Sequence, residues 1–197
     1  MATALPTSSQ IRVSGASLVS ARADLSPAFG GDESRIARLG SKWQMRFQLA
    51  AMTYADALAW TDLETETDTV LLPVPQPGKS LGSPGTPVVD GASQLGSTLN
   101  VRGCSAAYSV FKGQWVSIVI SSRRYLYRAT ADATADGLGV IALPLRPLIR
   151  VAPADGDTVE IASPKIEGYV RDLPANAFDT NEAGHVPGLS FSIRERG

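Results

Sequence analysis

The sequence has very little cysteine or histidine: Cys104 and His185 are the only residues of these types among 197. A single cysteine excludes a disulfide within the chain and a thiolate cage for a metal ion, and it fits a reducing compartment. A single histidine excludes a two-histidine metal site, and a catalytic triad would depend on His185 alone. We therefore interpret Cys104 as a small buried or half-buried apolar residue and His185 as an exposed loop residue, and we expect no bound metal.

Neither sign of charge is in excess, because 18 Lys and Arg stand against 19 Asp and Glu, for a net charge of -1. Such a chain has no net electrostatic field that would attract it to nucleic acid or to an anionic membrane, so we expect neither as a partner. No apolar run approaches the roughly 20 residues of a membrane span, and the first residues lack the features of a secretory signal. The chain is therefore expected to be made in the cytoplasm and to have protein partners.

Motifs for phosphate, calcium and carboxylate chemistry are all incomplete. Gly78-Lys79-Ser80 resembles the end of a phosphate-binding loop, but Pro73 stands where that loop needs its first glycine. Asp132 and Asp136-Gly137 lack the successive oxygen ligands of a calcium loop. The carboxylates of residues 62–68 lie on one short segment, which does not place two of them across a substrate cleft. We expect neither a cofactor nor an enzymatic activity.

Alternating apolar and polar residues, which are typical of β-strands, are abundant. Residues 42–49 are the clearest case, with apolar residues at 43, 45, 47 and 49 and the polar Gln44, Arg46 and Gln48 between them. Residues 113–147 predict an antiparallel meander of three strands. The first two, around 115–120 and 125–129, are separated at Ser121 and Ser122. The third, 140–143, follows a turn to which Asp136-Gly137 supplies positive φ, and it stops at Pro144 and Pro147 because proline cannot donate a ladder hydrogen bond.

Further strands are predicted along the chain. Residues 10–23 predict one or two edge strands around Gly15, and residues 35–39 predict a strand that pairs with 42–49 through a tight turn at Gly40-Ser41. The remaining predicted strands are 69–73, 97–102, 158–162, 165–171 and 187–194.

One helix is predicted after residue 53. Thr53 is an N-cap residue with Asp56 three positions later, and apolar residues then recur at spacings of three and four over about three turns. Tyr54, Leu58 and Trp60 are expected to dock this helix on a sheet.

A segment rich in proline divides the chain into two predicted domains. Residues 73–87 contain five prolines and three glycines, which predicts a connector. The strand near the C-terminus needs an earlier partner, and the N-terminal sheet is its natural host. The sequence therefore predicts a mostly β protein with two domains. Residues 1–85 with 164–197 form a β-sandwich domain with one short α-helix, and residues 86–163 form an inserted small antiparallel β-barrel or sandwich domain.

The order of these segments is similar to that of the distal tail proteins of long-tailed, siphovirus-like bacteriophages. The resemblance starts in residues 42–60, where a strand led by Trp43 runs into a short helix that carries Trp60. It continues in residues 96–103, 111–118, 124–130, 135–137, 145–147 and 155–156, and it covers about half of the chain. The sequence departs from the pattern at Gln114, where an acidic residue is expected.

The resemblance implies a structural virion protein that forms a homo-hexameric ring at the distal end of the tail tube. The first domain would form a belt around the channel, and the inserted domain would project from it. The ring would be assembled in the host cytoplasm and would join the tail tube protein to the hub and fibre proteins of the receptor-binding apparatus. A head-to-tail ring needs two different faces on each protomer. Our candidates for one of these faces are Arg35, Arg38, Gln44, Arg46 and Gln48. The alternative interpretation of these residues is ordinary solvated surface.

Two other functions remain open from the sequence. A carbohydrate-binding β-sandwich module of a tail tip would present Trp115, Tyr125 and Tyr127 as an aromatic platform. A tail-tip hydrolase would depend on His185. The same tyrosines with Arg123, Arg124 and Arg128 resemble a stacking surface for single-stranded nucleic acid, but we interpret them as a solvated sheet edge.

Overall fold

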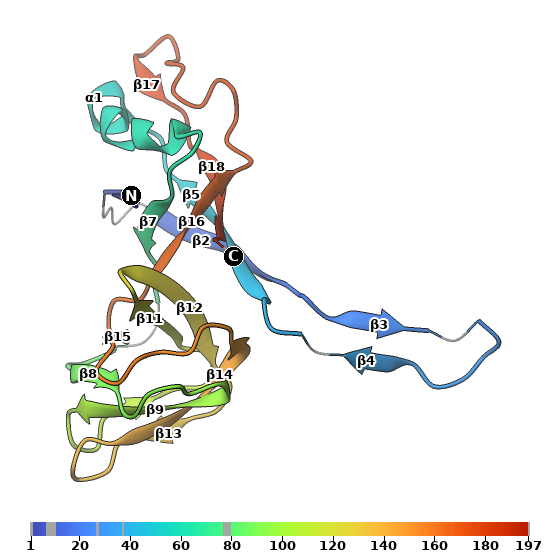
Figure 1. Cartoon of the computed structure of the whole chain (residues 1–197). Coiled ribbons are helices and arrows are strands. Elements are labelled where there is room, and N and C mark those ends of the chain that lie inside the picture. The colour runs from blue at the N-terminus through green and yellow to red at the C-terminus, as the bar shows by residue number, and fades with distance from the viewer. Residues whose placement is uncertain (1, 7–10, 27, 37, 77–79, 197) are drawn as a thin grey trace.

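The computed structural model describes residues 2–6, 11–26, 28–36, 38–76 and 80–196. The protein is mostly β with one short helix, so the predicted fold class is confirmed. Two six-stranded sheets lie one above the other, and a thin arm projects sideways from the upper one (Figure 1). No helix in the described part of the chain is long and apolar enough to cross a membrane.

The first sheet joins segments from both ends of the chain. Its strand order is β1-β7-β16-β18-β5-β2, and all pairs are antiparallel except β1 with β7. Its strands are β1 Thr3–Ala4, β2 Ile11–Val19, β5 Lys42–Leu49, β7 Val70–Pro73, β16 Lys165–Arg171 and β18 Ser190–Glu195. The C-terminal strand β18 lies between β16 and β5, so it pairs with the N-terminal part of the chain as predicted.

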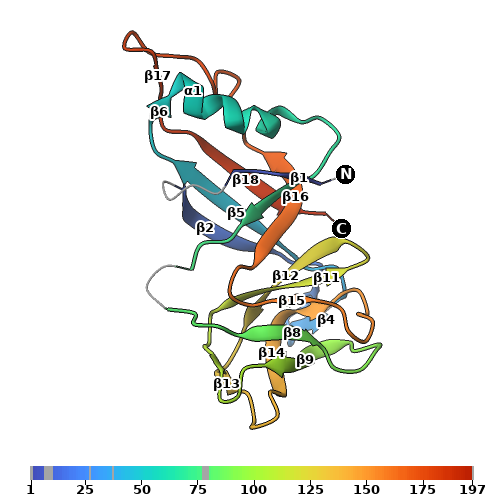
Figure 2. The same cartoon turned by 90° about the vertical axis from the view of Figure 1, so that its left-hand side faces the viewer.

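The second sheet contains only the residues between β7 and β16. Its strand order is β15-β11-β12-β14-β9-β8. A bridge between Val88 and Thr158 connects the two outer strands and nearly closes the sheet into a barrel. Its strands are β8 Gly85–Val89, β9 Gly96–Cys104, β11 Trp115–Ile120, β12 Arg123–Ala129, β14 Ile141–Ile149 and β15 Val159–Glu160. Figure 2 shows this barrel below the first sheet.

The predicted meander of β11, β12 and β14 is confirmed, but two details are wrong. β14 runs through Pro144 and Pro147. It lies between β9 and β12, and Pro144 pairs with Thr98 of β9. The register with β9 is irregular between Pro144 and Ile149, so the missing N–H of Pro147 falls where the ladder with β9 is interrupted. The turn before β14 takes its positive φ at Gly139 rather than Gly137. Asp136 Oδ1 stabilises this turn by accepting from two backbone N–H groups.

The sequence analysis predicted that residues 35–39 pair with β5, and this prediction is wrong. β4 (Ser34–Ile36) pairs instead with β3 (Ala23–Leu25), and both lie on the arm. β5 pairs with β2 and β18. The prediction failed because a glycine-serine pair marks a turn without specifying which strands it joins. The other two-stranded pairs are β6 (Met52–Thr53) with β17 (His185–Val186), and β10 (Ser109–Val110) with β13 (Ala133–Thr134).

The helix starts where predicted but continues differently. Thr53 caps α1 (Tyr54–Ala57), and the chain then tightens into the 3-10 helix η1 (Leu58–Glu64). Three residues per turn place Ala57, Trp60 and Leu63 on one buried line. Trp60 is therefore buried as predicted, whereas Tyr54 and Leu58 are 50% and 51% exposed, so their predicted docking is wrong.

Replacing Thr53 with alanine is expected to lower the free energy of unfolding by about 1 kcal/mol, because Thr53 Oγ1 accepts from Asp56 N at 3.2 Å. Urea unfolding followed by circular dichroism measures this loss. Thr67→Ala, at an exposed threonine of the same region, is the control. Equal effects of the two substitutions would show that the cap contributes nothing.

Two hydrophobic cores correspond broadly to the two sheets. Met45, Phe47 and Phe191 lie in the first core, and Cys104 is buried in the second, as predicted. Burial raises the pKa of the Cys104 thiol. Trp115 and Leu126 belong to strands of the second sheet but pack in the first core. The two sheets therefore share a packed junction.

A buried carboxylate links the two sheets at this junction. Glu195 of β18 accepts from Trp43 N at 2.6 Å, from Leu126 N at 2.7 Å and from Arg150 Nη2 at 2.6 Å. A second carboxylate, that of Glu167, accepts from the backbone N–H of β12 at Arg124. Acidic side chains of the first sheet thus bind backbone donors along one side of β12.

Close strand packing positions Glu195. Gly168 of β16 lies opposite Glu195 in the ladder, and a Cβ atom there would lie 2.1 Å from Arg194 O. A larger residue would push β16 and β18 apart. The glycine therefore allows β18 to carry Glu195 into the junction.

Candidate functional site: the arm and the outer face of the first sheet

Residues 20–41 form an arm that leaves the first sheet between β2 and β5. β3 and β4 run antiparallel along it, and the arm points away from both sheets (Figure 1). The Asp24 carboxylate forms ion pairs with Arg22 Nε and with Arg35 Nε, each at 3.3 Å, and the pair with Arg35 links β3 to β4. None of the arm residues that the structure describes belongs to either hydrophobic core. Its function therefore lies in what its surface contacts.

The arm carries a concentration of exposed apolar side chains. Leu25 and Leu39 are more than half exposed, Ile36 is exposed, and Phe29 is 100% exposed. Isolated exposed apolar residues are ordinary on a protein surface, but a group of them on an extension without its own core marks a contact surface for another protein. The sequence analysis missed these residues because the segment has no regular period. The available signal was the presence of leucine, isoleucine and phenylalanine without alternation.

Three of the five interface candidates share the outer face of the first sheet. Gln44 is half-buried and donates from Nε2 to Ser192 Oγ at 3.0 Å, whereas Arg46 and Gln48 are exposed. A shallow hollow of about 310 Å³ lies on this face, and Gln44 and Arg46 help to line it. The alternation predicted from sequence is confirmed, since the odd-numbered residues of β5 from Trp43 to Leu49 are buried.

The other two candidates, Arg35 and Arg38, lie on the arm. Both are exposed, and Arg35 pairs with Asp24. The structure therefore does not gather the five candidates into one patch. They belong to two surfaces, the arm and the face of β5, which are joined at the base of the arm.

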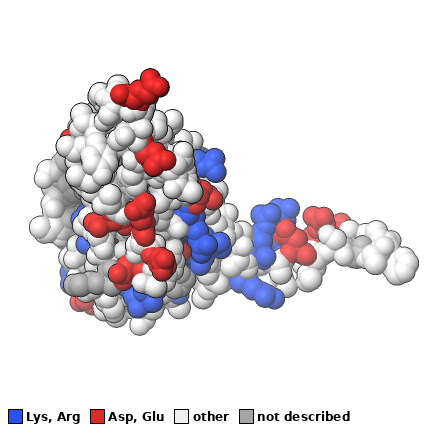
Figure 3. Space-filling view, turned by 90° about the horizontal axis from the view of Figure 1, so that it is seen from above, with Lys and Arg blue, Asp and Glu red and all other residues white. Residues whose placement is uncertain are grey.

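Charge is segregated over the molecule although its total is near zero. Residues 47–76 and 172–193 contain no Lys or Arg. They contain the following carboxylates: Asp56, Asp62, Glu64, Glu66, Asp68, Asp172, Asp179 and Glu182. Figure 3 looks down on the end formed by α1 and β17 and shows acidic side chains across it, basic ones beside the base of the arm, and both kinds along the arm. One end of the protein is therefore acidic, basic side chains gather beside the base of the arm, and the arm itself carries both signs of charge.

The three aromatic residues considered for sugar binding do not form an exposed platform. Trp115 is buried edge-on against Trp43, with ring centroids 4.9 Å apart. Tyr127 is fully buried, and burial raises its pKa to about 12. Tyr125 is half-buried, with the Arg150 guanidinium 5.3 Å from its ring centroid. These side chains pack the interior and the junction between the sheets.

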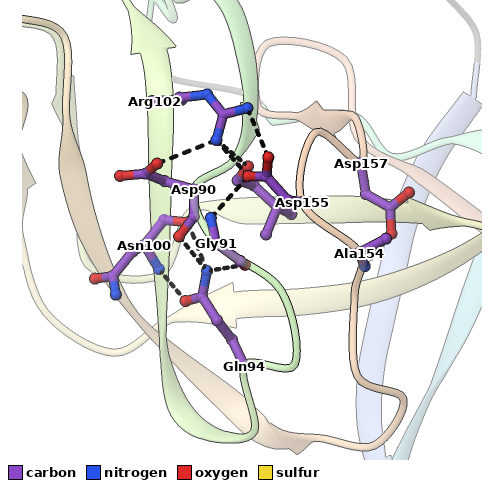
Figure 4. A network of polar contacts seen from close by, with 9 residues as sticks. Asp90, Gly91, Gln94, Asn100, Arg102, Ala154, Asp155 and Asp157 are labelled. Carbon is purple, nitrogen blue, oxygen red and sulfur yellow. Dashed lines mark hydrogen bonds and ion pairs between the residues drawn. The ribbon is translucent and has the colours of Figure 1, made fainter.

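A polar network surrounds Arg102 on β9 (Figure 4). Its guanidinium bonds both carboxylate oxygens of Asp155, one of them at 3.2 Å, and pairs with Asp90 at 3.1 Å. Asp155 also accepts from Gly91 N at 2.8 Å. Arg102 lowers the pKa of Asp155 to about 2, with the Gly91 N–H adding to the effect. The network ties the 90–100 loop to the turn at 155–157.

Asp155 is expected to stabilise the fold in its ionised form. Since its folded-state pKa lies below the ordinary value, this stability is present above about pH 4 and is lost as pH falls through about 2. Urea midpoints of the wild type and Asp155→Asn should therefore differ at neutral pH and converge below pH 2. Asp157→Asn, in the same turn, is the control. A constant difference between wild type and Asp155→Asn across this range would contradict the ionic role of Asp155.

His185 is exposed, as interpreted from sequence, but it lies on the short strand β17 and not in a loop. Its backbone N–H donates to Asn181 Oδ1 at 3.0 Å, and its ring Nδ1 lies 3.0 Å from Ala183 O. In the part of the chain that the structure describes, no three His, Cys, Asp or Glu side chains gather as a metal site. Gly78 and Lys79, from the phosphate-loop comparison, lie outside the described residues.

The sequence matches no protein-family model and no curated protein.

Proposed function

We propose that this chain is a structural subunit of a phage virion. Copies of it assemble head to tail into a closed ring of six at the distal end of the tail tube, and the ring joins the tube to the hub and receptor-binding proteins. The observation that carries this proposal is the arm, whose apolar side chains are exposed in the single chain. An extension of this kind is stabilised when a second molecule covers it.

Two further features support assembly between copies. A heterologous interface requires two unlike surfaces on each protomer, and the acidic end is unlike the arm with the basic side chains beside its base. The order of segments shared with the distal tail proteins supports the place of the ring in the virion. The protein combines a sheet that carries the arm with a barrel that has its own hydrophobic core. Such a two-part structure suits a protein that connects other proteins.

The proposal is tested on the purified full-length chain by native mass spectrometry and electron microscopy. We expect a closed ring of six subunits that binds the tail-tube protein. A species that stays single at all accessible concentrations contradicts the proposal. If such a monomer bound glycans on an array, the carbohydrate-binding alternative would replace it.

A further inference from the structure

A small cavity opens on the second sheet, where the connector from the first sheet meets the start of β11. Its volume of about 280 Å³ is at the low end of the roughly 300–1,000 Å³ of ligand pockets. Pro75, Leu81 and Trp115 give it apolar walls, and Lys112 and Arg128 bring positive charge to it. A cavity of this size and lining suits one apolar side chain that is flanked by negative charge.

The cavity is held in shape by contacts of its own walls. Gln76 Oε1 accepts from Trp115 N at 2.8 Å, which ties the connector to β11. Arg128 Nε donates to Gly113 O at 2.9 Å, and its guanidinium carbon lies 5.0 Å from the centroid of the Trp115 ring. The turn at Lys112 is fixed by its backbone N–H, which donates to Asp132 Oδ1, while the Lys112 side chain is exposed. Because the cavity walls are already ordered, they lose little conformational entropy when a side chain of another molecule binds in the cavity.

The tip of the arm has the matching chemistry. Phe29 is 100% exposed, and the exposed carboxylates Asp32 and Glu33 follow it after two glycines. The arm projects sideways, and its tip lies well away from both sheets of its own chain, so the tip is presented to other molecules (Figure 1). An aromatic ring beside two negative charges complements a tryptophan-walled cavity beside two positive charges.

We propose that the arm of one protomer docks on the second sheet of its neighbour in the ring, with Phe29 in the cavity beside Trp115 and Asp32 against Lys112. The inference rests on the ring assembly proposed above and specifies the two surfaces that meet. Arm and cavity belong to different parts of the chain, so the contact is heterologous and repeats around a closed ring. An aromatic side chain in a preformed pocket with a charged rim is a common arrangement of interface hot spots.

The apolar part of the contact is tested with full-length variants in a dilution series that measures the dissociation of the ring. Phe29→Ala is expected to raise the dissociation constant on the order of 10- to 100-fold, because a buried phenylalanine side chain is returned to water. Leu138→Ala is the matched control, since Leu138 is 88% exposed on a loop of the second sheet. Both positions are exposed in the single chain, so neither substitution disturbs a core.

The charged part is tested by exchange of charge. Asp32→Lys and Lys112→Glu are each expected to weaken the ring, and the variant that carries both is expected to restore it, because the pair is then opposite again. Arg123→Glu changes an exposed charge elsewhere on the second sheet and serves as the control. If the double variant is weaker than both single variants, Asp32 and Lys112 do not face each other.

A crosslink tests the contact directly. Chains with Ala28→Cys and chains with Lys112→Cys are mixed and oxidised, and we expect a disulfide that joins one chain of each kind. The comparison mixture contains Ala28→Cys and Arg123→Cys. Equal crosslinking in the two mixtures would overturn the proposed docking.

The outcomes separate this inference from the proposed function. If the wild type forms rings that none of the variants weakens, the arm docks elsewhere, and the proposed function stands. If Lys112→Glu leaves the ring intact but abolishes binding of the tail-tube protein, the cavity belongs to the tube contact and the inference is wrong. If the wild type forms no ring, both the inference and the proposed function are wrong.

Discussion

Replacement of Glu195 with alanine is expected to lower the free energy of unfolding by about 3–5 kcal/mol, because one partner of a buried ion pair is removed. The carboxylate accepts from Arg150 and from the backbone N–H groups of Trp43 and Leu126. The side chains of Arg150 and Glu195 are 5% and 1% exposed. Alanine leaves the guanidinium and two backbone donors buried without this acceptor. The loss is expected to affect both sheets, since Glu195 is on the first and Leu126 on the second.

Urea unfolding, followed by tryptophan fluorescence, measures this effect. Glu182→Ala removes an exposed carboxylate and is the control. Arg150→Met in the Glu195→Ala background is expected to recover part of the loss, since the uncompensated charge is then gone. A loss below about 1 kcal/mol for Glu195→Ala would mean that the junction does not depend on this carboxylate.

Acid is not expected to release the junction through Glu195. Burial raises the pKa of Glu195 above its ordinary value, and Arg150 opposes this rise. A carboxyl with a raised pKa in the folded state binds its proton more tightly there than in the unfolded chain. Its contribution to stability therefore falls as pH rises through the interval between the two pKa values, and it does not fall on acidification.

Removal of the arm is expected to abolish the ring and leave a folded monomer. Four exposed apolar side chains are lost with residues 22–39, and each would be worth roughly 1.5–3 kcal/mol when buried, so the dissociation constant should rise more than about 1,000-fold. Ala21 and Gly40 flank the deletion, and the Ala21 Cβ lies 3.6 Å from the place of a Cβ on Gly40. An Asn-Gly turn is therefore short enough to join them.

Analytical ultracentrifugation measures the oligomeric state of this arm-less variant, and urea unfolding measures its stability. The unfolding midpoint is expected to stay near that of the wild-type chain, because the arm contributes to neither core. Leu138→Ala removes an exposed apolar side chain from the second sheet instead and is the control. A ring that persists without the arm would show that the subunits meet through other surfaces.

The candidate site illustrates the limit of local patterns. Alternation along residues 42–49 correctly predicted which face of β5 is buried, and so it placed Gln44, Arg46 and Gln48 on one exposed face. It did not place Arg35 and Arg38, because both lie on the arm, where β4 pairs with β3 and not with β5. The exposed Phe29 was not among the candidates, since a single aromatic residue in a glycine-rich loop carries no periodic signal.

The sequence by itself determined the mostly β class, the buried faces of the clearest strands and the N-cap at Thr53, because these depend on neighbours within a few residues. Tertiary structure alone decided that Trp60 lies on a 3-10 face and that β14 continues through Pro144. It also decided that Glu195, near the end of the chain, is buried between two sheets. The course of β14 and the burial of Glu195 depend on which distant strand supplies the hydrogen-bond partner, and the burial of Trp60 depends on the core against which the helix packs. A local pattern does not contain that information.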